Sequence, residues 1–245
     1  MNHSEFMDPI KNPGVEKCLT FINCSLSPAK SVRSSKSGKA PLAITISREC
    51  GAGGHEIAVR LTTLLQAQAA SPNAPWTVFD RNLIDKVLED HNLPTRLGQF
   101  LHEDRVNELE DIMQEILGTQ PSSWKLVGQV TETILKLAEL GNVILVGRGA
   151  NVITAQLEHV FHVRLVGSIE RRVERIRQQM NLSQREAEAL AAKEDRGRAR
   201  YLKKYFGVAI DNPLLHHLTI NTDRLDLGEA AELIAVAARR HAGRS

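Results

Sequence analysis

"PLAITISRECGAGGHEIAVRLTTLL", residues 41–65, contains a short β-rich run, a glycine-rich turn and a helical pattern, in that order. Gly51, Gly53 and Gly54 lie in the turn, where glycines let backbone N–H groups point inward. The N-terminus of the following helix adds a dipole that favours an anion. The order predicts a phosphate-binding loop, although a plain strand-to-helix turn has the same layout.

The rest of the chain continues this alternation of strand and helix patterns. Short apolar runs predict strands at 76–79, 143–147, 161–166 and 217–221. Helical spacing of apolar residues, or a capping signal, predicts helices at 83–88, 106–116, 127–138, from 183 onward and at 226–238. We therefore expect a three-layer α/β/α fold with a five-stranded parallel sheet, which binds ligands at the carboxyl ends of its strands.

Composition narrows the class of protein. The chain has 245 residues, 42% of them hydrophobic, and a formal net charge of +2, which implies no bulk attraction to nucleic acid or membrane. Three cysteines form an odd set that is typical of reduced thiols, so we expect a cytoplasmic protein without a disulfide framework. We identify no signal peptide, no membrane-spanning run and no metal-ligand spacing among the histidines.

Residues 1–40 differ from the remainder. "SPAKSVRSSKSGKAP" is rich in Ser, Lys, Pro and Gly, which indicates a flexible extension and linker before a domain at 41–245. The extension is a candidate site for a protein partner, and the long helices of the domain would allow a homodimer.

The glycine-rich turn departs from the usual kinase loop. The Walker pattern G-x-x-x-x-G-K-[ST] is not met. If Gly53 is the second glycine, the first falls at Arg48, the lysine at Gly54 and the hydroxyl at His55.

Two other strand ends carry charged residues. Asp80 and Arg81 follow the second strand, where they either bind a phosphorylated ligand or cap a helix. Arg148 ends the third strand between two glycines, where a guanidinium can bind phosphate in a forked geometry. A structural salt bridge is the alternative for Arg148, and Asn151 is a nearby polar contact.

"EDRGRARYLKK", residues 194–204, is dense in arginine. Arg196 and Arg200 are four apart and are expected to share a helical face, with Arg198 pointing elsewhere and Asp195 holding one arginine in place. Positive charge in such a segment suits a transferring phosphoryl group, whereas a solvated basic face is the plainer interpretation.

Several segments together resemble the cytidylate-kinase-like family, a divergent branch of the nucleoside monophosphate kinases. The resemblance rests on "AITISRECGAGGHEIA", "VFDRNLIDKV", "VILVGRGANVI", "HVRLVGSIERRVERI", "KEDRGRARYLKKYFG" and "LTINTDRLDL". It implies a P-loop, nucleoside monophosphate kinase-like fold with a helical acceptor-binding insert at about 82–140 and an arginine-rich lid at about 181–206. It also implies ATP and Mg²⁺ as cofactors and a (deoxy)nucleoside monophosphate, such as CMP, as acceptor.

The resemblance and the residue patterns give three sets of expected site residues. Those expected to bind ATP phosphates are Ser47, Arg48, Gly51, Ala52, Gly53, Gly54, His55 and Glu56. Those expected to be catalytic are Arg48, Arg148, Arg196 and Arg200, with Asp195 in support. Those expected to bind the acceptor are Asp80, Arg81, Arg148 and Asn151.

The missing lysine leaves two interpretations. In the first, Arg48 and the lid arginines supply the lysine's charge, with Glu56 or Ser47 helping to position the metal. In the second, the chain binds a nucleotide or phosphate without transferring it and acts as a sensor or scaffold. A module that binds nucleic acid through the lid is a lesser alternative.

Overall fold

The computed structural model describes residues 41–67, 75–80 and 125–243. The strands are β1 (Ala43–Arg48), β2 (Thr77–Phe79), β3 (Val143–Val146), β4 (Val160–Val166) and β5 (Leu218–Asn221). The helices are α3 (Gly54–Gln66), α7 (Lys125–Leu140), α8 (Ala150–Ile153), α9 (Ile169–Met180), α10 (Gln184–Phe206), a short 3-10 helix (Pro213–Leu215) and α11 (Leu227–Ala242).

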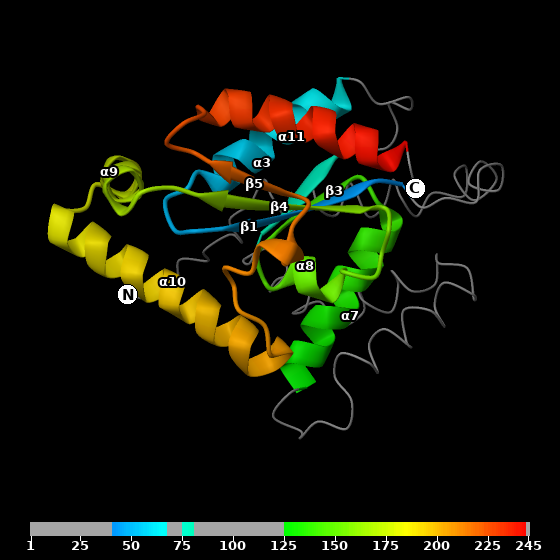
Figure 1. Cartoon of the computed structure of the whole chain (residues 1–245), viewed down its shortest axis with the longest axis horizontal. Coiled ribbons are helices and arrows are strands. Elements are labelled where there is room, and N and C mark those ends of the chain that lie inside the picture. Colours follow the sequence, from blue (N-terminus) through cyan, green and yellow to red (C-terminus); the bar gives the residue numbers. More distant parts are fainter. Residues whose placement is uncertain (1–40, 68–74, 81–124, 244–245) are drawn as a thin grey trace, which may run out of the picture.

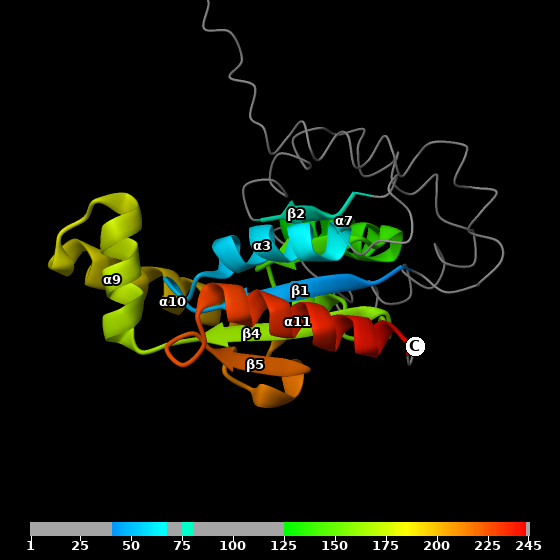
Figure 2. The ribbon, with the colours of Figure 1, turned by 90° about the horizontal axis from the view of Figure 1, so that it is seen from above.

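The five strands form one parallel sheet in the order β2-β3-β1-β4-β5, which confirms the predicted fold class. Helices α3 and α11 pack together on one face, and α7 and α8 lie on the other (Figure 1). Helices α9 and α10 extend beyond the carboxyl ends of the strands, as both ribbon views show (Figure 2). These two helices therefore border the carboxyl edge of the sheet, where the sequence predicts ligand binding.

Alternation along the strands separates an apolar face from a more polar one. Ile44 and Ile46 of β1 join the apolar core under α3 and α11. Their neighbour Thr45 is also buried, but its hydroxyl hydrogen-bonds to His162 of β4 at 2.9 Å. Since successive side chains point to opposite faces, Thr45, Ser47, His162 and Arg164 lie on the face opposite to that core. Polar side chains can therefore lie along these strands on the face opposite to the apolar core, without interrupting that core.

Helix signals in the sequence mark real boundaries. Ser183 and Asp226 each form a complete capping box, at the starts of α10 and α11. Helix α9, capped by Ser168, was not predicted, because its "IERRVERIRQQM" buries few apolar residues. The predicted helices at 83–88 and 106–116, the extension at 1–40 and most of the proposed insert lie outside the described residues.

The C-terminal part of the proposed insert is described as α7. This helix packs against β3, β1 and α8, so it forms part of the layer that covers the sheet. In the described part of the chain, no helix is both long enough and apolar enough to span a membrane.

Two left-handed glycines allow a matched stability test. Gly141 and Gly207 have φ of 66° and 70°. A β-carbon at Gly141 would overlap the backbone of Pro41, whereas one at Gly207 would have nothing within 4 Å. We expect Gly207→Ala to lower the unfolding free energy by about 1 kcal/mol through backbone strain alone, and Gly141→Ala by roughly 2–4 kcal/mol. Urea denaturation measures both, and equal losses would contradict the packing account.

Candidate functional site

The loop between β1 and α3 has the backbone geometry of an anion site. Gly51 and Gly53 adopt φ of 79° and 78°. Gly53 is the N-cap of α3, and no side chain caps this helix. The N–H groups of the first turn therefore lack the side-chain acceptor that usually satisfies one of them, and they remain suited to an anion.

Each loop glycine also faces a close neighbour within the protein. A β-carbon at Gly51 would overlap the backbone carbonyl of Arg172 in α9, and one at Gly53 would lie 2.5 Å from the Leu227 side chain. At Gly54 it would lie 2.9 Å from Cγ of Arg48. Close packing by α9, α11 and Arg48 is thus sufficient to explain these glycines, whether or not a phosphate binds.

Arg48 crosses the carboxyl edge of the sheet. Its aliphatic stem passes over Gly54, and its guanidinium reaches Gly147 at the end of β3, where any β-carbon would overlap Nη1. Burial, together with the nearby charge of Arg198, lowers the pKa of Arg48 to about 10, so the group remains a cation at neutral pH. In the described residues, this guanidinium has neither a hydrogen-bond acceptor nor an ion-pair partner within 4 Å.

Arg48 lines a cavity of about 370 Å³, a size within the usual range for small-molecule sites. The cavity lies between the ends of β1 and β3 and helix α10. Five basic side chains and one carboxylate, that of Glu194, belong to its lining; Tyr201, Leu202 and Ile210 add an apolar wall. The basic residues are Arg48, Arg148, Lys193, Arg198 and Arg200. This composition suits an anionic ligand with an apolar or aromatic part.

Arg148 enters the cavity from an unusual backbone. Gly147, Arg148 and Gly149 all have positive φ, of 86°, 55° and 73°. An arginine in the left-handed region costs conformational energy, and such strain is found mostly at functional sites. The Phe206 side chain would lie 3.0 Å from a β-carbon at Gly149, so α10 packs directly onto this turn.

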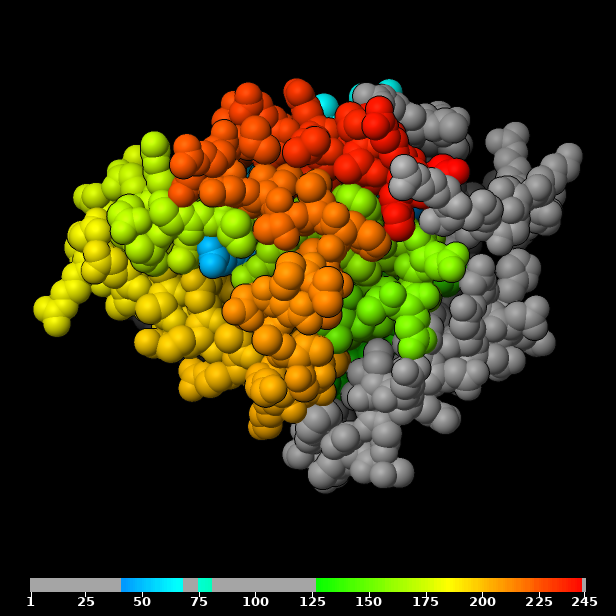
Figure 3. Space-filling view, viewed as in Figure 1, coloured from blue at the N-terminus to red at the C-terminus, as the bar shows by residue number. Residues whose placement is uncertain are grey.

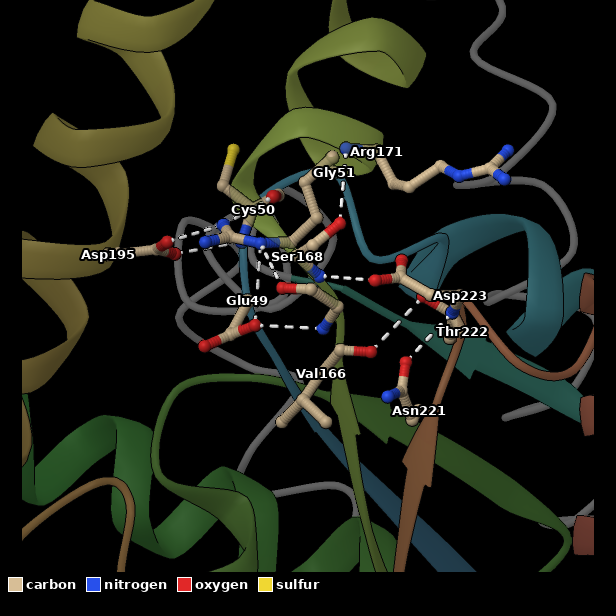
Figure 4. Close-up of polar contacts among 12 residues, drawn as sticks. Glu49, Cys50, Gly51, Val166, Ser168, Arg171, Asp195, Asn221, Thr222 and Asp223 are labelled. Atoms are coloured by element: carbon tan, nitrogen blue, oxygen red, sulfur yellow. Dashed lines mark hydrogen bonds and ion pairs between the residues drawn. The ribbon is translucent and has the colours of Figure 1, made fainter.

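Asp195 of α10 joins the lid to the loop. Its Oδ1 accepts a hydrogen bond from the Cys50 backbone N–H at 2.8 Å (Figure 4). The same oxygen accepts from Arg198 at 2.8 Å, and Oδ2 accepts from Arg172 at 2.7 Å. Burial alone would raise the pKa of Asp195, but the bonds from Arg198, Cys50 and Arg172 outweigh it and hold the pKa below its usual range. Asp195 thus holds two arginines, where the sequence predicted one.

A second set of bonds ties the loop to the end of β5. Arg175 donates to the Gly51 carbonyl at 3.3 Å and to the Thr222 hydroxyl at 3.0 Å. The Ser168 N–H donates to Asp223 at 2.7 Å, and Gly167 N–H donates to Glu49 at 3.0 Å (Figure 4). Only a small blue patch of the β1 region reaches the surface in Figure 3, because segments from α9 to β5 surround it.

The predicted phosphate-binding residues fall into two places. Ser47 and Arg48 line the cavity, and the Ser47 hydroxyl accepts a bond from Arg164 at 2.8 Å. The remaining predicted residues lie around the start of α3, with Ala52 buried and Glu56 paired with Arg60 at 2.9 Å. His55 and Asp80 approach to 3.9 Å, while Arg81 lies outside the described residues.

The predicted lid arginines separate. Arg200 lines the cavity but Arg196 does not, so a catalytic role for Arg196 stays a prediction. The expectation that Arg198 points elsewhere is wrong, since Arg198 lines the same cavity as Arg200. The reason is helical geometry: Arg198 lies one position from Gly197 and four from Glu194, on the broad face that α10 turns toward the sheet.

Sequence reasoning missed several residues of the site, among them three basic ones. Arg164 carried a signal, because it is a charge inside an otherwise apolar strand, and it is buried. Arg172 is also buried, but it belongs to the unpredicted α9 and looks like any surface arginine in sequence. Lys193 of α10 lines the cavity. Apart from the many charges of its segment, nothing in the sequence indicated a place in the site.

The described residues contain no group of three or more side chains that could hold a metal ion. Mg²⁺ needs fewer, because it keeps several waters and is usually bound by one or two carboxylates together with substrate phosphates. Asp80, next to His55, and Glu194 in the cavity wall are two carboxylates near the phosphate loop and cavity that could take this role. The Walker pattern has a Ser or Thr hydroxyl that binds Mg²⁺ at the position of His55, and this chain has no hydroxyl there.

Comparisons with known proteins give one family match and two structural similarities. The model of the cytidylate kinase-like family matches residues 43–224. An uncharacterized protein from Eubacterium ventriosum ATCC 27560 is similar in structure, with a TM-score of 0.55 and 18% identity over 81% of this chain and 98% of that one. TT1252 from Thermus thermophilus gives a TM-score of 0.43 and 14% identity over 82% and 98%. No curated protein matches.

Asp195 accepts hydrogen bonds from Cys50, Arg172 and Arg198, a set that we call the Asp195 clamp. This clamp predicts that the stability of the fold depends on pH. A carboxylate with a lowered folded-state pKa stabilises the fold above its unfolded pKa and loses that contribution as the pH falls. We expect Asp195→Asn to lower the unfolding free energy at pH 7 by about 1–3 kcal/mol, since Arg172 loses a charged partner. The variant should also lose less stability than wild type between about pH 5 and pH 3.

Chemical denaturation across this pH range provides the measurement. Glu232→Gln, which removes an exposed carboxylate of α11, is the control and should follow wild type. An Asp195→Asn curve parallel to wild type at every pH would contradict the clamp.

Proposed function

The chain belongs to the cytidylate kinase-like family, and we propose that it transfers the γ-phosphoryl group of ATP to a nucleoside monophosphate such as CMP, or to a related small acceptor. An acceptor oxygen forms the new bond to the γ-phosphorus. The bond from that phosphorus to the bridging oxygen breaks with its electrons going to ADP, and the acceptor proton goes to solvent. In this proposal Arg48 supplies the charge that a lysine supplies in other phosphate loops.

One observation carries this proposal. The Arg48 guanidinium lines a basic cavity and has no hydrogen-bond acceptor or ion-pair partner in the described residues. Its neighbours Arg164, Arg172 and Arg198 are all hydrogen-bonded within the protein. A desolvated guanidinium without such partners favours an anion in the cavity. Phosphoryl transfer depends on charge placed around the moving group more than on covalent chemistry, so an arginine suits the task.

The space around Arg48 explains why no lysine follows Gly53. The Arg48 stem occupies the position that a side chain at Gly54 would need. Arginine at 48 and lysine at 54 are therefore alternatives. The Walker pattern has a glycine at the position of Arg48 and a lysine at the position of Gly54. In this chain the cation stands at the first position and the glycine at the second.

The cavity offers room for the acceptor. Arg148, Arg198 and Arg200 line it on the side proposed for the acceptor phosphate, and Tyr201, Leu202 and Ile210 provide an apolar wall for the rest of the acceptor. ATP would place its phosphates over the first turn of α3, and Mg²⁺ would neutralise phosphate charge there. Arg48 lies between these two places, where the transferring group would pass.

A specific observation favours a second function, that of a sensor which binds nucleotide without transfer. Arg172 and Arg175 bond to the carbonyls of Cys50 and Gly51, and α9 covers this turn. A loop held in this way would need rearrangement before it wrapped a phosphate closely. Purified protein incubated with Mg-ATP and a panel of mononucleotides separates the two functions, because the sensor binds nucleotide but forms no ADP.

An exchange of residues tests the role of Arg48 directly. We expect Arg48→Ala to reduce turnover by about 100- to 1,000-fold, the usual loss for one group that stabilises transition-state charge. Gly54→Lys alone should also be poorly active, because Arg48 fills the required space. The double variant Arg48→Gly, Gly54→Lys rebuilds the Walker order and should recover at least about tenfold over Arg48→Gly.

Steady-state ADP formation, with circular dichroism to confirm folding, is the measurement. Arg240→Ala, an exposed arginine of α11, should match wild type within about twofold. Wild-type turnover in Arg48→Ala would overturn the role of Arg48. A double variant no better than Arg48→Gly would contradict the exchange.

A further inference from the structure

His216 touches a side chain of the cavity without lining the cavity itself. It follows the 3-10 helix Pro213–Leu215 and precedes β5. Its Nε2 lies 3.3 Å from Nδ2 of Asn151 in α8. Asn151 is only 5% exposed, yet it belongs to the cavity lining. The histidine therefore stands directly behind a polar residue of the site.

The ring of His216 has a defined hydrogen-bonding pattern. It also bonds to the backbone of Asn212, in the sense that raises the His216 pKa, so the ring donates this bond to the carbonyl. Burial and the charge of Arg164 lower the pKa to about 4, so the ring is neutral at pH 7 and has a single N–H. Because Nε2 is the ring nitrogen beside the Asn151 amide, we assign the N–H that donates to Asn212 to Nδ1, which makes Nε2 the acceptor.

The acceptor on His216 fixes the orientation of the Asn151 amide. Only the amide NH₂ can donate to Nε2, so the nitrogen of Asn151 turns toward His216 and the carbonyl oxygen turns away. Within the described part of the chain, no group donates to that oxygen. A nearly buried residue of the cavity wall thus keeps one hydrogen-bond acceptor for a ligand.

We propose that His216 is a positioning residue that holds Asn151 with its carbonyl oxygen toward the cavity, and that Asn151 selects an acceptor substrate carrying an N–H or O–H donor. This inference rests on the proposed function, because it assumes a nucleotide in the cavity. The donor is either the exocyclic amino group of the base or a hydroxyl of the sugar. A carbonyl oxygen or a hydrogen atom at the same position leaves the Asn151 acceptor unpaired and is disfavoured.

Paired acceptors separate the two sources of the donor. UMP has a carbonyl in place of the amino group of CMP, and dCMP lacks the 2′-hydroxyl. We expect wild type to prefer CMP over at least one of them by about fivefold to tenfold in kcat/KM, as for one neutral hydrogen bond. In Asn151→Ala and in His216→Phe this ratio should fall toward one through a higher KM for CMP, with the KM for ATP within about twofold of wild type.

Two further variants distinguish positioning from a structural role. His216→Gln retains an acceptor and should keep part of the discrimination that His216→Phe loses. His217→Phe makes the same change one residue later, in a ring that stacks on Phe161 and His162, and should keep the wild-type ratio. Loss of discrimination in His217→Phe equal to that in His216→Phe would overturn the inference.

The remaining outcomes are also decisive. Wild-type ratios in Asn151→Ala and His216→Phe, or no discrimination in wild type, overturn this inference while turnover upholds the proposed function. If wild type binds nucleotides without transfer, the same ratios are measured as dissociation constants by calorimetry. A wild-type protein that neither binds nor phosphorylates any of the three nucleotides overturns both.

Discussion

A guanidinium that leaves water must meet negative charge or oxygen acceptors, and this constraint organises the carboxyl edge of the sheet. Arg172 and Arg198 meet it through Asp195, and Arg164 donates to Ser47. Arg48 alone among these four has no such partner in the described residues, although Asp80 and Glu194 act on it from a distance. The positive character of the cavity follows from Arg48 together with Arg148 and the basic residues of α10.

The path of Arg48 also sets its surroundings. Its stem requires a small residue at 54 and its guanidinium requires one at 147, where a β-carbon would overlap it. Positions 48, 54 and 147 are therefore interdependent, although they come from two different strand ends. The glycine at 54 is therefore a steric consequence of Arg48. The absence of a lysine at 54 does not mean that the loop has lost its positive charge, because Arg48 carries one.

The sequence predicted the layers better than the site. All five strands were located because short apolar runs alternate with helical spacing. A capping box marked the start of α10, and amphipathic spacing marked α11. Helix α9 was missed because its face is mostly charged, so periodicity gave no signal. Two partners of Asp195, Arg172 and the Cys50 N–H, were missed for a related reason. They lie 23 and 145 positions from Asp195 along the chain, and such contacts depend on packing that no local pattern encodes.

The orientation of Arg198 shows the same limit at a smaller scale. Spacing along a helix tells which residues share a face, but not which face turns toward the sheet. That choice depends on Leu202, which is buried, and on Phe206, which packs over Gly149. Arg198 follows these apolar residues to the cavity, while Arg196 remains exposed.

The same contacts determine the order in which charges become available to a ligand. An anion that approaches Arg198 must compete with Glu194 and Asp195, which already hold its guanidinium at 3.2 and 2.8 Å. Arg48 has no such competitor in the described residues, so a phosphate can engage it without breaking a hydrogen bond or an ion pair. Asp195 accepts hydrogen bonds from three donors, namely Cys50, Arg172 and Arg198. If Arg198 then turns to the phosphate, Asp195 loses one of these three bonds. Binding in the cavity is thereby coupled, through a single carboxylate, to the backbone of the phosphate loop.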